Sequence, residues 1–70
     1  MRSEYTAIVK QDGKWWIGWI EEVPGVNCQE DSKHELTLSL HAALKEAIEF
    51  NRNDARAAAG DDFAEIKIAV

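Results

Sequence analysis

The segment "YTAIVKQDGKWWIGWIEEVPG", residues 5–25, constrains the fold more than any other part of this chain. Residues 4–10 and 14–21 are rich in β-branched and aromatic side chains, which is typical of strands. Asp12-Gly13 between them is a dipeptide favoured in two-residue type I′ hairpin turns. Pro24-Gly25 prevents the second strand from continuing. The sequence therefore predicts an antiparallel hairpin at the start of the domain.

The predicted pairing of this hairpin sorts its side chains onto two faces. If Asp12-Gly13 are the loop residues, Gln11 pairs with Lys14, and alternate residues share a face. One face carries Tyr5, Ala7, Val9, Trp16, Gly18 and Ile20, and the other carries Thr6, Ile8, Lys10, Trp15, Ile17 and Trp19. Ala7 opposite Gly18 leaves a hollow that lets a helix approach closely, so we expect the first face to be the core. The alternative is the inverted arrangement, with the helix on Trp15 and Trp19.

A third strand and a helix are expected next. Residues 25–30 predict a short strand with Val26 and Cys28 pointing inward. The "SKHE" sequence that follows is a capping box, in which Ser32 and Glu35 satisfy each other's backbone N–H groups. Apolar and small residues then recur at three- and four-residue steps, which is typical of an amphipathic helix that ends at Gly60. This stripe consists of Leu36, Leu40, Ala43, Leu44, Ala47, Ile48, Asn51 and Ala55.

The predicted helix is longer than the strands on which it packs. A helix over residues 33–59 would be about 40 Å long, whereas a seven-residue strand covers about 23 Å. The helix either overhangs the sheet or bends near residues 51–54, where helix propensity is lower. We favour a bend or break there, followed by a short Ala-rich helical segment.

The last residues complete the predicted fold. In "FAEIKIAV", residues 63–70, apolar Ile66, Ile68 and Val70 alternate with other residues, which predicts a half-buried strand. The expected fold class is therefore α+β with the order β-β-β-α-β. A three-stranded antiparallel meander is followed by a crossover helix on one face. The right-handed crossover rule places the fourth strand parallel to the first, in the order 3-2-1-4.

The length of the chain limits what it can bury. Seventy residues, 1–70, form a single domain. A domain of this size has a small core and often needs a disulfide, a metal or a partner. The single cysteine, Cys28, excludes an intrachain disulfide, and with His34 and His41 it lacks the paired spacing of metal ligands. We therefore expect no cofactor and no metal, but a homodimer or higher oligomer formed through sheet or edge-strand contacts.

Charge bears on the kind of partner. The formal net charge is −5, and the eight Lys and Arg residues are scattered along the chain. This pattern argues against binding to phosphates of nucleic acids and favours a basic partner. The alternative is that the charge keeps a small domain soluble. No apolar run is long enough for a signal peptide or a membrane span, so with a free thiol we expect a cytoplasmic protein.

The order of these elements resembles the N-terminal domain of HicB family antitoxins. The resemblance covers roughly 45 residues: the tyrosine-led first strand, the aromatic-rich second strand ending in Glu22-Val23-Pro24-Gly25, the short polar strand, and the capped helix. It implies a partial ribonuclease-H-like fold and a stand-alone short member of the family. Many members add a DNA-binding domain, which we do not expect here, so we expect no direct DNA binding.

The resemblance also implies a function. A HicB-like domain would bind and block a small, basic ribonuclease toxin of the HicA type, within a type II toxin–antitoxin system. The alternative is an orphan oligomeric domain that has a structural or small-ligand-binding role and no toxin partner.

Catalysis is not expected. Ribonuclease-H-like enzymes hold two metal ions on carboxylates, beginning with an acid inside the first strand. Residues 5–9 contain no acid. Asp61-Asp62 is expected to solvate the turn after the helix, and Cys28 to be a small buried apolar group.

The expected partner-binding residues are apolar anchors and loop acids. Trp16 belongs to the predicted core, whereas the other two tryptophans lie on the face that one helix cannot cover. Such an apolar patch is larger than soluble monomers usually expose. Glu30 and Asp31 are expected across the same loop as the second strand's last acids, in position to meet a basic partner. The full set is Trp15, Ile17, Trp19, Glu21, Glu22, Pro24, Glu30 and Asp31.

Overall fold

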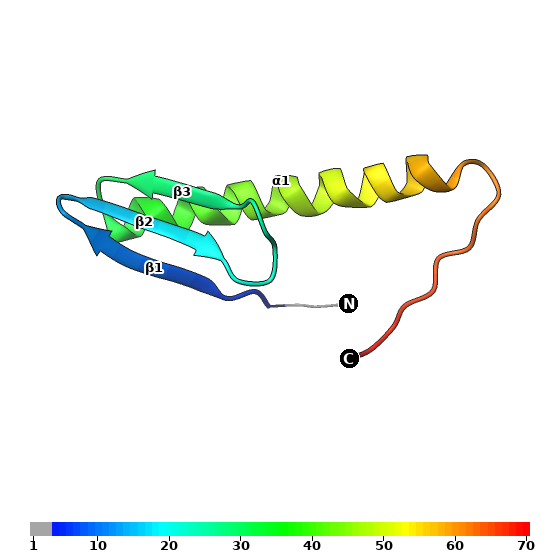
Figure 1. The fold of residues 1–70 in the computed structure, drawn as a ribbon, viewed down its shortest axis with the longest axis horizontal. Helices are drawn as coiled ribbons and strands as arrows, with labels where there is room; N and C mark the ends of the chain where they lie inside the picture. The colour runs from blue at the N-terminus through cyan, green and yellow to red at the C-terminus, as the bar shows by residue number, and fades with distance from the viewer. Residues whose placement is uncertain (1–3) are drawn as a thin grey trace.

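A three-stranded sheet and one long helix make up the protein. This computed structural model describes residues 4–70. Strands β1 (Ala7–Asp12), β2 (Trp15–Ile20) and β3 (Asn27–Glu30) form an antiparallel sheet in the order β1-β2-β3, and helix α1 (Lys33–Ala59) follows (Figure 1). The predicted meander and the helix after it are confirmed.

The hairpin turn differs from the predicted one. Asp12 pairs with Trp15, so the loop residues are Gly13 and Lys14, and the predicted pairing of Gln11 with Lys14 is wrong by two residues. Gly13 has φ of 63°, and no other residue type has positive φ within residues 4–70. This matches a type II′ turn, in which only the first central residue needs positive φ. A shift of two residues leaves every side chain on its predicted face.

The core lies between the sheet and the first half of α1. Leu36 and Leu40 of the helix are 0% and 2% exposed, and Ile20 and Val26 are each 5% exposed. They pack on the face that carries Trp16, Gly18 and Ile20, as predicted. The inverted arrangement is therefore excluded. Val26 and Cys28 point inward, as expected for the third strand.

The ends of α1 lie where the sequence predicts them. The Ser32 Oγ accepts a hydrogen bond of 3.1 Å from the Glu35 N–H, which satisfies one of the unpaired donors at the helix start. Gly60 ends the helix with φ of 84°, and its N–H donates to the Ala57 carbonyl at 3.3 Å. Positive φ is a conformation that glycine adopts without strain.

The helix continues through residues 51–54, so the predicted bend or break is wrong. Half-buried positions end at Ile48, and Asn51 and Ala55, the last residues of the predicted stripe, are exposed. From Ile48 to Ala59 the helix overhangs the core by about 17 Å. The low helix propensity of residues 51–54 costs only tenths of a kcal/mol per residue. All four residues of this segment are exposed and helical.

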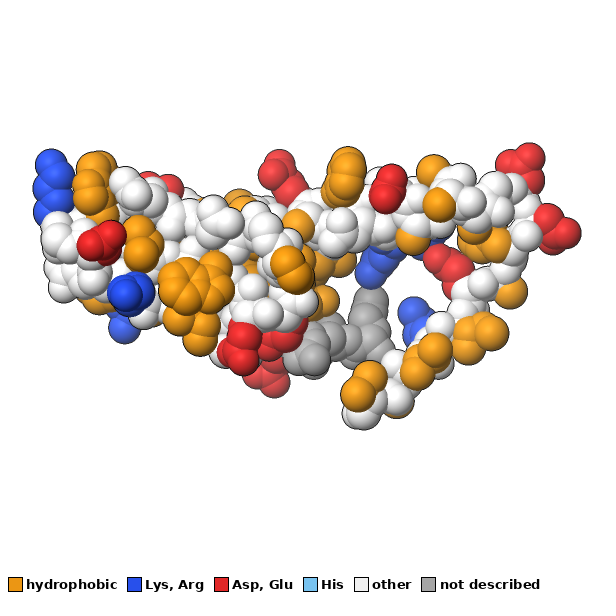
Figure 2. All heavy atoms as spheres, viewed as in Figure 1, with side chains coloured by type: hydrophobic (Ala, Val, Ile, Leu, Met, Phe, Trp, Pro, Cys, Tyr) orange, Lys and Arg blue, Asp and Glu red, His pale blue; other side chains and the backbone are white. Residues whose placement is uncertain are grey.

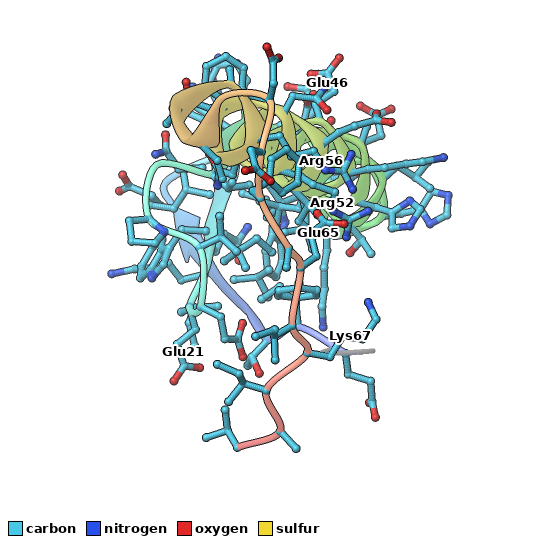
Figure 3. All side chains as sticks on the ribbon, turned by 90° about the vertical axis from the view of Figure 1, so that its right-hand side faces the viewer. Glu21, Glu46, Arg52, Arg56, Glu65 and Lys67 are labelled. Carbon is cyan, nitrogen blue, oxygen red and sulfur yellow. The ribbon has the colours of Figure 1, made fainter. Side chains whose placement is uncertain are left out.

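The last ten residues form no strand in the described part of the chain, so the predicted β-β-β-α-β order is wrong. The helix overhang gives the physical reason. The chain turns back at Gly60, well beyond the sheet, and its end stops short of β1 (Figure 1). The tail instead contacts the far half of α1, where the Arg56 Nε donates to the Glu65 Oε1 at 2.9 Å (Figure 3).

Candidate protein-binding surface

One face of the sheet is not covered by the helix that the structure describes. We call it the outer face and define its apolar part by Ile8, Trp15, Ile17 and Trp19. Ile8 and Trp15 are each 37% exposed, Trp19 is 41% exposed, and Ile17 is half-buried. Ile8 and Trp19 are direct cross-strand partners, so the patch continues from β2 onto β1. In Figure 2 large apolar side chains gather over the strands.

Alternation along β2 produces this patch. Trp16, Gly18 and Ile20 face α1, so the residues between them must face the other way. A single helix covers only one face of the sheet. The Lys14 Nζ lies 5.3 Å from the centre of the Trp15 ring, and Lys10 is the cross-strand partner of Ile17, so two cations also border the patch. A connected apolar patch with polar neighbours is typical of a protein-binding surface.

Like Asp12, the cross-strand partner of Trp15, Glu21 is an acid that borders the outer face. It continues the row of Trp15, Ile17 and Trp19 by the same two-residue step, and it is exposed. Figure 3 shows it on the side of the molecule away from the helix. Its carboxylate is therefore available to a cationic group of a partner that covers the tryptophans.

Glu22 has an internal role. Its Oε1 accepts a hydrogen bond of 2.7 Å from the Thr6 N–H. This bond links the loop after β2 to the residue just before β1. Next to it, the Glu21 N–H donates to the Thr6 carbonyl at 2.9 Å and extends the β1–β2 pairing by one residue. Glu22 therefore supports the start of β1.

Glu30 and Asp31 lie at the opposite end of the sheet from Glu21. β3 runs away from the loop that carries Glu21, and its last residue, Glu30, pairs with Trp16. Glu30 faces the helix, where its Oε2 accepts a hydrogen bond of 2.6 Å from the Ser39 Oγ. The expectation that these acids lie across one loop is wrong, because a full strand separates them. Asp31 is exposed beside the helix start, where an acid suits the helix dipole.

Pro24 also lies apart from the tryptophans. It lines a shallow hollow between the β2–β3 loop and the middle of α1, together with Val26, Ala47 and Phe50. Phe50 is 69% exposed at the rim of this hollow. The structure thus brings together Trp15, Ile17, Trp19 and Glu21 and leaves the other four predicted residues elsewhere.

Ile8 is the residue that the predicted site omitted. Its side chain lies beside Trp19 and is exposed. The signal was present in the sequence, because the predicted faces already placed Ile8 with the tryptophans. The same two-residue step also distinguishes Glu21, on the outer face, from Glu22.

Cys28 and the two histidines are the remaining side chains that could take part in chemistry. Burial, and then the charge of Glu30, raises the pKa of the Cys28 thiol, which favours the unreactive protonated form. His34 and His41 are exposed on the helix. Within residues 4–70, no three His, Cys, Asp or Glu side chains lie close enough together to hold a metal ion. The same residues contain no helix that could cross a membrane.

Comparisons with known proteins leave the family open. No family model matches the chain, and neither the curated proteins nor the solved structures contain a significant match. The resemblance to HicB antitoxins therefore stays a prediction from the residues that carry it.

Proposed function

We propose that this protein is a non-catalytic interaction module that binds a small basic protein through the outer face of its sheet. The observation that carries the proposal is the exposure of Trp15 and Trp19, at 37% and 41%, on a face without a helix. Tryptophans in such positions are the residues that most often dominate binding energy in protein interfaces.

Charge supports a basic partner. The net charge is −5, and Glu21 extends the apolar row on the same face. In such interfaces, charges speed up the encounter of the two proteins, and buried apolar contacts slow their separation. The combination suits a partner whose own binding surface carries lysines or arginines around apolar groups.

The more specific form of the proposal is an antitoxin-like inhibitor of a small basic ribonuclease in the cytoplasm. Its support is the HicB resemblance over the hairpin, the Pro24-Gly25 loop and the capped helix. A ribonuclease binds its anionic substrate on a basic surface. An acidic protein that covers this surface excludes RNA, so no group of this chain needs to take part in chemistry.

The gene next to this one provides the test. The proposal expects it to encode a short basic protein that cleaves RNA, and expects this chain to inhibit the cleavage at a stoichiometric ratio. Co-purification and an RNA-cleavage assay with both purified proteins measure this. A neighbour that is not basic, or a basic neighbour that does not bind, contradicts the antitoxin proposal.

A further inference from the structure

The free edge of β1 is a second surface that the structure leaves without a partner. Within residues 4–70, β1 pairs only with β2, and α1 packs on β2 and β3. The tail also stops short of β1 in Figure 1. An open strand edge of this kind can pair with another strand.

The backbone groups that point out of this edge can be identified. The Thr6 carbonyl accepts from the Glu21 N–H, so Thr6 faces β2. Backbone groups alternate along an antiparallel strand, so Ala7 and Val9 direct their N–H and C=O groups away from β2. In agreement, the Ile20 N–H opposite Ala7 donates to the Val26 carbonyl instead. No residue that the structure describes pairs with the outward groups of Ala7 or Val9.

The geometry points to a second copy of this chain as the occupant: two β1 strands pair antiparallel about a two-fold axis at Ala7. Outward groups occur only at odd-numbered residues of β1, so hydrogen-bonded pairs must join odd residues. Ala7 then pairs with Ala7 of the second copy, and Val9 lies opposite Tyr5. The result is one six-stranded sheet with the order β3-β2-β1-β1-β2-β3.

Charge favours this register over the register shifted by two residues toward the turn. With Ala7 at the axis, Lys10 of each copy lies opposite Glu4 of the other. Both residues are exposed, and alternation along the strand places both on the outer-face side. A shift by two residues places Glu4 opposite Asp12 instead, which brings like charges together. Opposite charges across antiparallel strands stabilise the pairing, and like charges oppose it.

The position of Lys10 in the edge strand β1 favours a register in which an acid of the second copy lies opposite it. A lysine in an edge strand normally prevents pairing with other chains. In this register the Glu4 carboxylate of each copy lies opposite the Lys10 ammonium group of the other copy and offsets its charge. β3 is the weaker candidate for self-pairing because it has only four residues.

The dimer leaves the outer face open. The axis is perpendicular to the sheet, so both helices lie on one side and both tryptophan patches on the other. The inference does not rest on the proposed function, because it concerns the edge of β1 and is measured on the purified protein alone.

Sedimentation equilibrium of the charge variants tests the register. We expect the wild type to be a dimer. Lys10→Glu and Glu4→Lys should each weaken the dimer by about tenfold or more, because each creates two like-charge pairs. The double variant Glu4→Lys/Lys10→Glu should restore the dimer to within a few-fold of the wild type. Lys14→Glu in the turn makes the same change of charge away from the axis and should have little effect.

A backbone variant provides an independent test. Ala7→Pro removes the N–H at the two-fold axis without removing a bond to β2, so it should give a monomer with unchanged helix content by circular dichroism. A wild type that is monomeric at its highest soluble concentration overturns the inference. It is equally overturned by single charge variants that dimerise normally, or by a double variant that stays as weak as the single variants.

Discussion

A Cβ atom on Gly18 would lie 3.0 Å from the Leu40 Cδ1 and only 2.8 Å from the Ile8 carbonyl oxygen. α1 thus rests on β2 at the one position of the strand that has no side chain. This contact holds the helix against one face of the sheet, and the tryptophans of β2 on the other face stay exposed.

Gly18→Ala should therefore destabilise the protein. The new methyl group must displace either the backbone of β1 or the helix, and overpacking of this kind costs about 1–3 kcal/mol. Urea unfolding followed by circular dichroism measures the cost. Gly13→Ala is the control, because nothing lies within 4 Å of its added carbon and its cost comes only from the positive φ. A Gly18→Ala protein as stable as the wild type would show that the helix does not sit this close to the sheet.

The local parts of the fold could be predicted from the sequence. The hairpin, the two faces of β2, the Ser32 cap and the Gly60 stop are each encoded within a few residues, and all were found. The register was off by two because Asp12-Gly13 and Gly13-Lys14 both supply a two-residue turn. Only backbone geometry tells a type I′ turn from a type II′ turn.

The predictions that are wrong concern contacts between segments that lie far apart in the sequence. Whether the helix breaks near residues 51–54 depends on how this segment packs, and all four of its residues are exposed. The course of residues 61–70 depends in turn on where the helix ends. The grouping of Glu21 with Glu30 failed for a related reason, because the direction of β3 separates them. Glu30 also accepts a hydrogen bond from Ser39 of the helix, and no sequence pattern predicts this bond.

Cys28 should make the stability depend on pH in the alkaline range. Its pKa is raised above the ordinary value of 9.0 by burial and by Glu30. In the unfolded chain the thiol loses its proton at lower pH than in the folded protein. The contribution of Cys28 is therefore complete below pH 9.0 and is lost as the pH rises through the folded pKa. Unfolding free energies from pH 8 to 10 should fall more steeply for the wild type than for Cys28→Ala; equal slopes would contradict this.

Glu65 should hold the tail against α1 in a pH-dependent way. Its hydrogen bond and charge interaction with Arg56 lower the pKa of the carboxyl below its ordinary value of 4.5. The contact is therefore complete above pH 4.5 and is lost as the pH falls through the lowered pKa. Titration of the Glu65 carboxyl by NMR measures this. Arg56→Gln should return the pKa toward 4.5, and Arg52→Gln should change it less, because Arg52 is the weakest of its charge neighbours.

Binding kinetics should separate the roles of charge and apolar contact on the outer face. Glu21→Lys should slow association with the basic partner and weaken its dependence on salt, because exposed charges act mainly on encounter. Trp19→Ala should speed dissociation, at a cost of about 2 kcal/mol or more if Trp19 is an anchor. Glu46→Lys on α1 makes the same charge change away from the outer face and is the control. If Glu21→Lys and Glu46→Lys behave alike, only net charge matters and the site is elsewhere.

The NMR signals of the three tryptophan indole N–H groups test the central claim most directly. Trp15 and Trp19 lie on the outer face, whereas Trp16 packs against the core beneath α1. On addition of the basic partner, the account predicts that the Trp15 and Trp19 indole signals shift or broaden while the Trp16 signal stays in place. Binding that changes the Trp16 signal alone, or none of the three, would contradict the assignment of the outer face as the binding surface.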